Sequence, residues 1–125
     1  MTTDELKLRT KKFALRILKL VGALPKSIEG RAIAGQLVRA GTSVAANYRS
    51  ACRARSKAEV IAKLGVVLEE ADETQLWLEL IIEGKLVPAV RVKPLLEEAN
   101  ELVAIFVSSR KSASANLRSK IANLQ

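Results

Sequence analysis

The sequence predicts an all-α fold, in which residues 1–125 form one domain, an antiparallel up-down-up-down four-helix bundle. Three Pro and six Gly occur in 125 residues, and the stretches between the prolines are rich in Ala, Leu, Lys, Glu and Arg, which favour helices. A chain of this length fits one domain, because two halves would each be too small to bury a good core. Helices of about 20–28 residues joined by short connections pack antiparallel to their neighbours.

Each predicted helix has a recognisable beginning. Thr3 and Ser27 precede the first two helices as N-cap residues, whose side-chain oxygens can accept from free amides of the first turn. Ser56 and Glu59 have the spacing of a capping box at the start of the third helix. Pro94 marks the fourth, because proline is favoured in the first turn. The helices are expected over residues 4–23, 28–54, 57–84 and 94–115.

The composition argues against an enzyme. The chain has no His and one Cys, so it cannot form a Ser-His-Asp triad, a Cys-His dyad or the usual zinc and iron–sulfur sites. The carboxylates of residues 57–84 suggest a di-iron bundle, but such a site needs Glu-x-x-His motifs. We therefore expect no catalytic residue, no metal and no cofactor, and we interpret Cys52 as a small buried residue. An enzymatic alternative would have only Asp, Glu, Lys, Tyr48 and Cys52 to work with.

The sequence carries no sign of a membrane span or an export signal. No run of about 18 apolar residues occurs, and the first residues are polar and acidic where a signal peptide would be basic and then apolar. A single cysteine cannot build a disulfide framework, which fits a reducing compartment. These features together predict a cytoplasmic protein.

The strongest functional signal is an excess of positive charge. Lys and Arg number 21 against 13 Asp and Glu, which gives a net charge of +8. Four of these cations follow one another at intervals of three or four residues along the first helix and so form one stripe. Such a face binds phosphate backbones through counterion release, with little regard for base sequence. The candidate nucleic-acid contacts are Arg9, Lys12, Arg16, Lys19, Arg39, Arg49 and Arg53.

A solvated basic face that binds nothing is the alternative interpretation of this stripe. The first two helices are cationic whereas the third is anionic, so part of the charge can be neutralised inside the bundle or between subunits. Arg49 and Arg53 either bind phosphate or pair with third-helix carboxylates such as Asp72 and Glu79. In the second case their removal would destabilise the bundle. Aromatic residues, at 3%, are too few for a platform on which bases could stack.

The first helix carries apolar residues on two faces. One face is the expected core stripe, made of Leu6, Phe13, Ile17, Leu20 and Leu24. Leu8, Leu15 and Leu18 lie on nearly the opposite side, where a monomeric bundle has no use for three leucines. We therefore expect them to contact another copy of the chain, with scattered surface leucines as the alternative.

The third helix has a core stripe of its own, made of Val60, Leu64, Ala71, Leu78 and Ile82. Trp77 and Ile81 are one turn apart and lie off the centre of this stripe. We expect these two residues to contact a second subunit or the edge of a neighbouring helix.

Three segments carry a family resemblance, at residues 36–49, 54–59 and 70–80. The first contains the run Ala-Gly-Thr-Ser-Val-Ala-Ala-Asn at residues 40–47, within a helix whose small side chains allow neighbours to approach closely. The chain resembles, from about residue 13 to residue 106, the four-helix bundle proteins encoded by intervening sequences of 23S ribosomal RNA genes.

The resemblance implies a homo-oligomer with a basic surface, a barrel-like pentamer in the expected form, and no enzymatic activity. The family is also similar to accessory proteins of diversity-generating retroelements, which bind nucleic acid and a reverse transcriptase. The leading hypothesis is therefore a non-enzymatic oligomeric bundle that binds RNA or DNA through phosphate contacts. The alternative is a protein-interaction scaffold that docks a nucleic-acid enzyme such as a reverse transcriptase.

Overall fold

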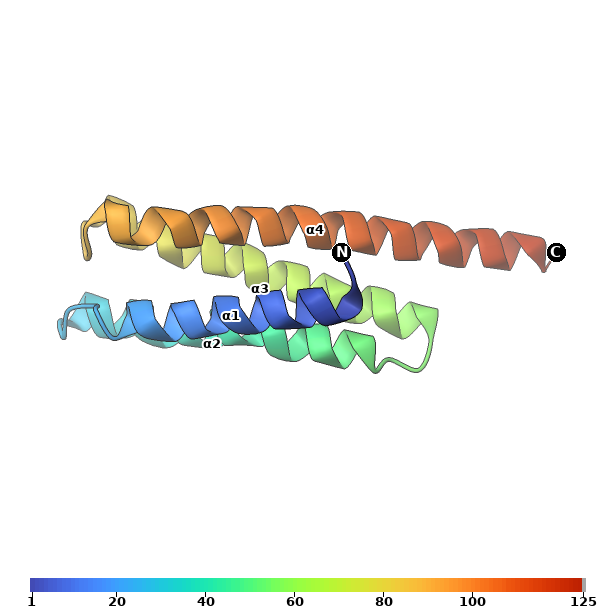
Figure 1. The fold of residues 1–125 in the computed structure, drawn as a ribbon, viewed down its shortest axis with the longest axis horizontal. Coiled ribbons are helices and arrows are strands. Elements are labelled where there is room, and N and C mark those ends of the chain that lie inside the picture. Colours follow the sequence, from blue (N-terminus) through green and yellow to red (C-terminus); the bar gives the residue numbers. More distant parts are fainter. Residues whose placement is uncertain (125) are drawn as a thin grey trace.

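The computed structural model describes residues 1–124, and in these residues four helices pack into one bundle without any strand. Each helix packs on its neighbours in the chain, and α1 also contacts α4, so α1 and α3 are diagonal to each other. The short connections lie at alternate ends of the bundle (Figure 1). The helices are α1 (Thr3–Val21), α2 (Ile28–Cys52), α3 (Lys57–Glu83) and α4 (Ala89–Asn123).

Side-chain caps fix three of the four helix beginnings. Ser27 Oγ accepts from Gly30 N at 3.1 Å, which confirms the expected N-cap of α2. The cap of α1 is Thr2 and not Thr3, because Thr2 has the extended backbone of a cap and completes a capping box with Glu5. Ser56 Oγ accepts from the Glu59 amide as expected. The Glu59 carboxylate, however, accepts from Arg55 N, one residue before the cap.

Helix α4 is longer than its predicted span at both ends. It begins at Ala89 after Pro88, so Pro94 lies inside the helix and does not mark its first turn. Pro94 and Val90 are both exposed, and the carbonyl that the missing amide of Pro94 would have bonded can be solvated there. At the other end the helix continues to Asn123, because Ala, Leu, Lys and Arg are good helix formers. Its last turns project past the other three helices (Figure 1).

The core confirms the predicted faces of α1 and shifts that of α3. Leu6, Phe13, Ile17, Leu20 and Leu24 are all buried, as the helical spacing predicted. On α3 the buried stripe is rotated from its predicted centre, so that Ile81 is fully buried and Ile82 is only half-buried. The buried residues of α3 are Leu64, Val67, Ala71, Thr74, Leu78 and Ile81.

The helices α1 and α2 approach each other closely at Gly41. A Cβ at this position would lie 2.8 Å from Ile17 Cγ1 and 3.0 Å from Ile17 Cγ2, closer than real contacts allow. The flanking Ala40 and Val44 are also fully buried. The small residues of the run at 40–47 thus have a packing role, since they let the Ile17 side chain sit against the α2 backbone.

The turn after α3 contains a backbone conformation that glycine normally takes. Lys85 has φ 57°, and the amides of Lys85 and Leu86 donate to the carbonyls of Ile82 and Ile81. This is a Schellman ending, whose left-handed position glycine occupies most readily. We expect Lys85→Gly to stabilise the fold by about 0.5–1 kcal/mol, because relief of the left-handed strain exceeds the added freedom of the unfolded chain.

Urea unfolding of the Lys85→Gly variant measures this gain, with Lys85→Ala as the control, since alanine removes the same charge without relieving the strain. An equal gain in both variants would show that loss of the charge, and not relief of the backbone, is responsible. Within the part of the chain that the structure describes, no helix combines the length and apolar character needed to cross a membrane.

Candidate nucleic-acid interface

The candidate cations divide into those already bound to carboxylates and those exposed without a partner. Arg9 belongs to the first group and joins α1 to α4. Its Nε donates to Glu98 Oε2 at 2.8 Å and its Nη2 to Glu98 Oε1 at 2.6 Å, a two-point contact, while Glu101 Oε2 lies 3.3 Å away. The Glu98 side chain is only 16% exposed. Arg9 is therefore a fastener between helices, and its guanidinium is occupied.

The hydrogen bond from Arg9 holds the pKa of the Glu98 carboxyl below its ordinary value of 4.5, against an opposing effect of burial. A carboxyl with a lowered pKa in the folded state stabilises the fold above its ordinary pKa, and this contribution is lost as pH falls through the folded value. The nearby charge of Arg16 lowers the Glu98 pKa further.

Replacement of Arg9 by glutamine should therefore destabilise the bundle in a pH-dependent way. We expect a loss of about 1 kcal/mol at neutral pH, because Glu98 is left half-buried without its partner. The difference from the unmodified chain should shrink as pH falls below 4.5, where Glu98 becomes protonated in both proteins. Urea unfolding at a series of pH values measures it. Arg16→Gln, on the same helix but at an exposed side chain, is the matched control, and a loss of the same size at every pH would contradict the assignment.

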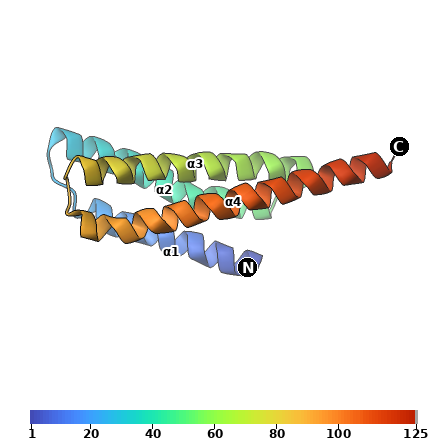
Figure 2. The same ribbon diagram turned by 90° about the horizontal axis from the view of Figure 1, so that it is seen from above.

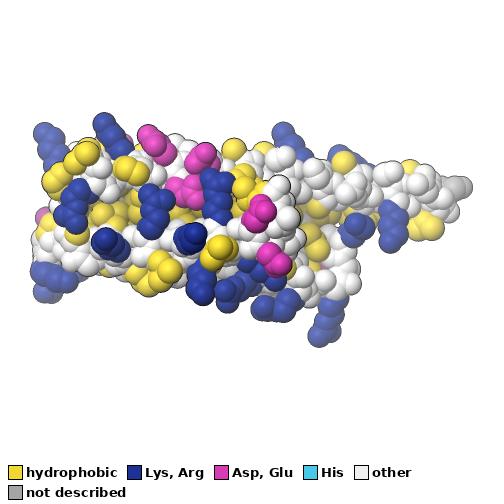
Figure 3. All heavy atoms as spheres, viewed as in Figure 1, with side chains coloured by type: hydrophobic (Ala, Val, Ile, Leu, Met, Phe, Trp, Pro, Cys, Tyr) yellow, Lys and Arg dark blue, Asp and Glu magenta, His cyan; other side chains and the backbone are white. Residues whose placement is uncertain are grey.

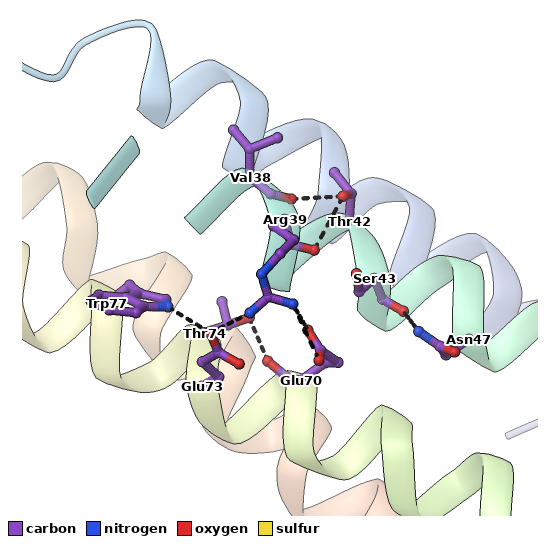
Figure 4. Close-up of polar contacts among 9 residues, drawn as sticks. All are labelled: Val38, Arg39, Thr42, Ser43, Asn47, Glu70, Glu73, Thr74 and Trp77. Carbon is purple, nitrogen blue, oxygen red and sulfur yellow. Dashed lines mark hydrogen bonds and ion pairs between the residues drawn. The ribbon is translucent and has the colours of Figure 1, made fainter. Parts of the chain in front are cut away.

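Arg39 has the corresponding position between α2 and α3 (Figure 4). Its Nη1 lies 3.0 Å from Glu70 Oε2, and its Nη2 donates to Glu73 Oε1. The hydrogen bond from Arg39 lowers the pKa of the Glu73 carboxyl, and a second bond from Trp77 Nε1, at 3.3 Å, acts in the same direction. Arg39 thus takes the role of pairing with third-helix carboxylates.

Arg49 and Arg53 do not take that role. Both side chains are exposed on α2, and neither forms an ion pair with a carboxylate within residues 1–124. Asp72 and Glu79, expected at a seam between helices, are exposed on α3 instead. Both arginines therefore remain candidates for phosphate contacts, whereas Arg9 and Arg39 contribute mainly to the fold.

Three exposed cations meet in a groove between α1 and α4. Arg16 and Lys19 of the predicted stripe line it together with Arg91, from the first turn of α4, and its floor is apolar, formed by Leu20 and Leu95. None of the three cations forms an ion pair within the described residues. Lys12 is exposed on the same helix outside the groove. We call the set Arg16, Lys19 and Arg91 the cationic groove.

Arg91 did not stand out from the sequence because it has no periodic partner on its own helix. The signal that could have identified it is topological. In a bundle with short connections, the start of the fourth helix lies beside the end of the first, and that is where Arg91 reaches Lys19. A second cationic surface follows the last turns of α4, where Arg110, Lys111 and Arg118 line a depression beside Leu68 of α3.

The surface over α1 and α2 is predominantly cationic. Figure 3 shows Lys and Arg side chains spread along these helices, with the carboxylates confined to the contact between α1 and α4 and to the start of α1. Only Arg9 and Arg39 of the 21 Lys and Arg form ion pairs in the described part of the chain. A strong field from unpaired cations is the electrostatic condition for binding a polyanion.

The residues predicted for contacts between subunits have different surroundings. Leu8, Leu15 and Leu18 are 52%, 56% and 48% exposed and so are available to a partner. Trp77 is half-buried against the core. Ile81 is fully buried within its own chain, because the apolar stripe of α3 is rotated towards it, and it offers no surface to another subunit.

The fold and these surfaces define a class, the four-helix bundles with a strongly basic exterior. The family model for the 23S rRNA-intervening sequence protein matches residues 5–108, and the chain belongs to this family. A solved structure from Bacteroides thetaiotaomicron, described as a protein with unknown function from the S23 ribosomal protein family, is similar, with 32% identity and a TM-score of 0.81. The match covers 89% of this chain and 99% of that one. None of the curated proteins matches the chain.

Proposed function

We propose that the chain is an up-down-up-down bundle that assembles into a homo-oligomer, a pentamer in its expected form, and binds RNA or DNA through phosphate contacts in the cytoplasm. The role is non-enzymatic. The observation that carries the proposal is the division of the cations, since 21 Lys and Arg are present and only Arg9 and Arg39 are paired within the described residues. Membership of a family named for 23S rRNA intervening sequences supports an RNA context.

The cationic groove is the best candidate for the principal contact. Its three cations come from two helices that Arg9 fastens together, so they are held at a fixed separation. Lys12, Arg49 and Arg53 extend the cationic surface along α1 and α2. Such a surface recognises the repeated charge of a phosphate backbone rather than the identity of bases.

A salt titration tests the proposal. The affinity for a labelled RNA of about 30 nucleotides, followed by fluorescence anisotropy, should fall steeply with salt, by about 0.7 in log Kd per log salt for each phosphate neutralised on a single strand. The same titration with a DNA of equal length separates the two nucleic acids. No binding at low salt, or an affinity that salt leaves unchanged, would refute the proposal.

The scaffold alternative is separated by a pull-down after nuclease treatment. If a reverse transcriptase or another nucleic-acid enzyme stays bound to a purified oligomer that ignores RNA, the cations serve protein docking and solubility. If the interaction disappears with the nucleic acid, phosphate binding is the primary activity.

A further inference from the structure

The outward face of α1 combines leucines with unpaired lysines. Leu8 and Leu15 are about half exposed, and Lys11 and Lys12 are exposed between them without an ion pair in the described residues. No Asp or Glu occurs from Leu6 to Ile28. We call Leu8, Lys11, Lys12, Leu15 and Leu18 the basic leucine face.

The outward face of α3 has the same apolar character and the opposite charge. Leu76 and Leu80 are 48% and 39% exposed. No Lys or Arg occurs from Leu64 to Gly84, and Arg39 pairs with two of the carboxylates in this stretch. The remaining four are exposed and form no ion pair within residues 1–124. We call the following set the acidic leucine face: Glu69, Asp72, Leu76, Glu79, Leu80 and Glu83.

These two faces lie on opposite sides of the bundle. Helices α1 and α3 are diagonal, and the buried stripe of each points inward, so their exposed stripes point away from each other. Figure 2 shows α1 and α3 at the two outer sides, with α2 and α4 between them. One copy of the chain can therefore offer both faces at the same time.

We propose that the basic leucine face of one copy packs on the acidic leucine face of the next. A symmetric contact between two like faces is disfavoured, because it would bring lysines against lysines or carboxylates against carboxylates. The complementary contact buries leucines from both sides and pairs charges that have no partner in the single chain. Because the two faces differ, the contact is head-to-tail and repeats from copy to copy, which gives a closed ring or an open filament and not a two-fold dimer.

This inference rests on the self-association in the proposed function and names the two surfaces that make it. The contact uses Lys11 and Lys12, which lie outside the cationic groove, so the groove stays available to phosphate. Repetition of the contact places one groove on each copy along the same assembly, and the cationic surface grows with the number of copies.

Charge exchange between the faces tests the inference by sedimentation velocity on protein freed of nucleic acid. Lys11→Glu with Lys12→Glu makes both faces acidic, and Asp72→Lys with Glu79→Lys makes both basic, so each variant alone should associate about tenfold more weakly or worse. An equimolar mixture of the two should associate again, since each then finds an opposite face. The chain with all four substitutions should do so by itself. Circular dichroism confirms that each variant is folded.

Lys111→Glu with Arg118→Glu on α4 is the matched control, because it changes the net charge equally without touching either face. Association that survives either single exchange, or a mixture that stays monomeric, would overturn the inference, as would an unmodified chain that is monomeric. RNA anisotropy on the same proteins keeps the two proposals apart. A monomer that binds RNA refutes only the contact between faces, and an oligomer that ignores RNA refutes only the nucleic-acid role.

Discussion

Reversal of the cationic groove, by Arg16→Glu, Lys19→Glu and Arg91→Glu together, is expected to weaken RNA binding by about a hundredfold at low salt. The three side chains line one groove between α1 and α4, so their replacement removes three attractions and adds three repulsions at a single place. The dependence of log Kd on log salt should become less steep by about 3, roughly one for each lost phosphate contact. Anisotropy titrations of the variant and the unmodified chain at several salt concentrations measure both quantities.

A second triple variant distinguishes the groove from net charge. Lys26, Lys57 and Lys85 are exposed in or beside the connections between helices, and their replacement by glutamate changes the total charge by the same amount. We expect this control to lose much less affinity than the groove variant. Equal losses would mean that the whole positive field binds RNA and that the groove is not a distinct site. Unfolding midpoints of both variants should stay close to that of the unmodified chain, because none of the six residues is paired within residues 1–124.

Substitution of Gly41 by valine is expected to cause the largest loss of stability, about 3 kcal/mol. Any Cβ at this position meets Ile17 at 2.8 Å, and the added methyl groups of valine must push α1 away from α2 or force Ile17 from its rotamer. Thermal and urea unfolding followed by circular dichroism measure the loss. Gly35→Val on the same helix is the control, since no atom lies within 4 Å of a Cβ placed there.

The control should be neutral or slightly stabilising, because valine is a better helix former than glycine. If both variants lost the same stability, the effect would come from valine in a helix and not from the contact with Ile17. A pronounced loss at Gly41 alone would explain in physical terms why small residues occupy positions 40 and 41, where the resemblance to the family is strongest.

The sequence predicted those features that depend on one helix at a time. The spacing of apolar residues separated Leu6 and Ile17, which are buried, from Leu8 and Leu15, which are exposed, because the helical period alone sets these directions. Ser27 and Ser56 marked two helix beginnings correctly, since a cap is formed within one turn. Cys52, interpreted as buried, is exposed at the last residue of α2.

The features that were missed depend on how two helices are rotated and aligned against each other. Arg9 meets Glu98 across 89 residues of chain, and no pattern within either helix indicates which face of α4 lies opposite Arg9. The same holds for Arg39 and Glu70, and for Arg91 beside Lys19. Charge counts predicted that some cations are neutralised, but only the packing decides which ones.

The long end of α4 affects how the chain meets proteases. Among the described residues after Phe106 none is buried, so the backbone there can open without any unpacking of the core. This stretch contains Arg110, Lys111, Arg118 and Lys120 and no acidic residue, which makes it the natural place for a trypsin-like enzyme to cut. Cleavage there would shorten α4 and remove part of the positive charge, yet leave every buried side chain in place.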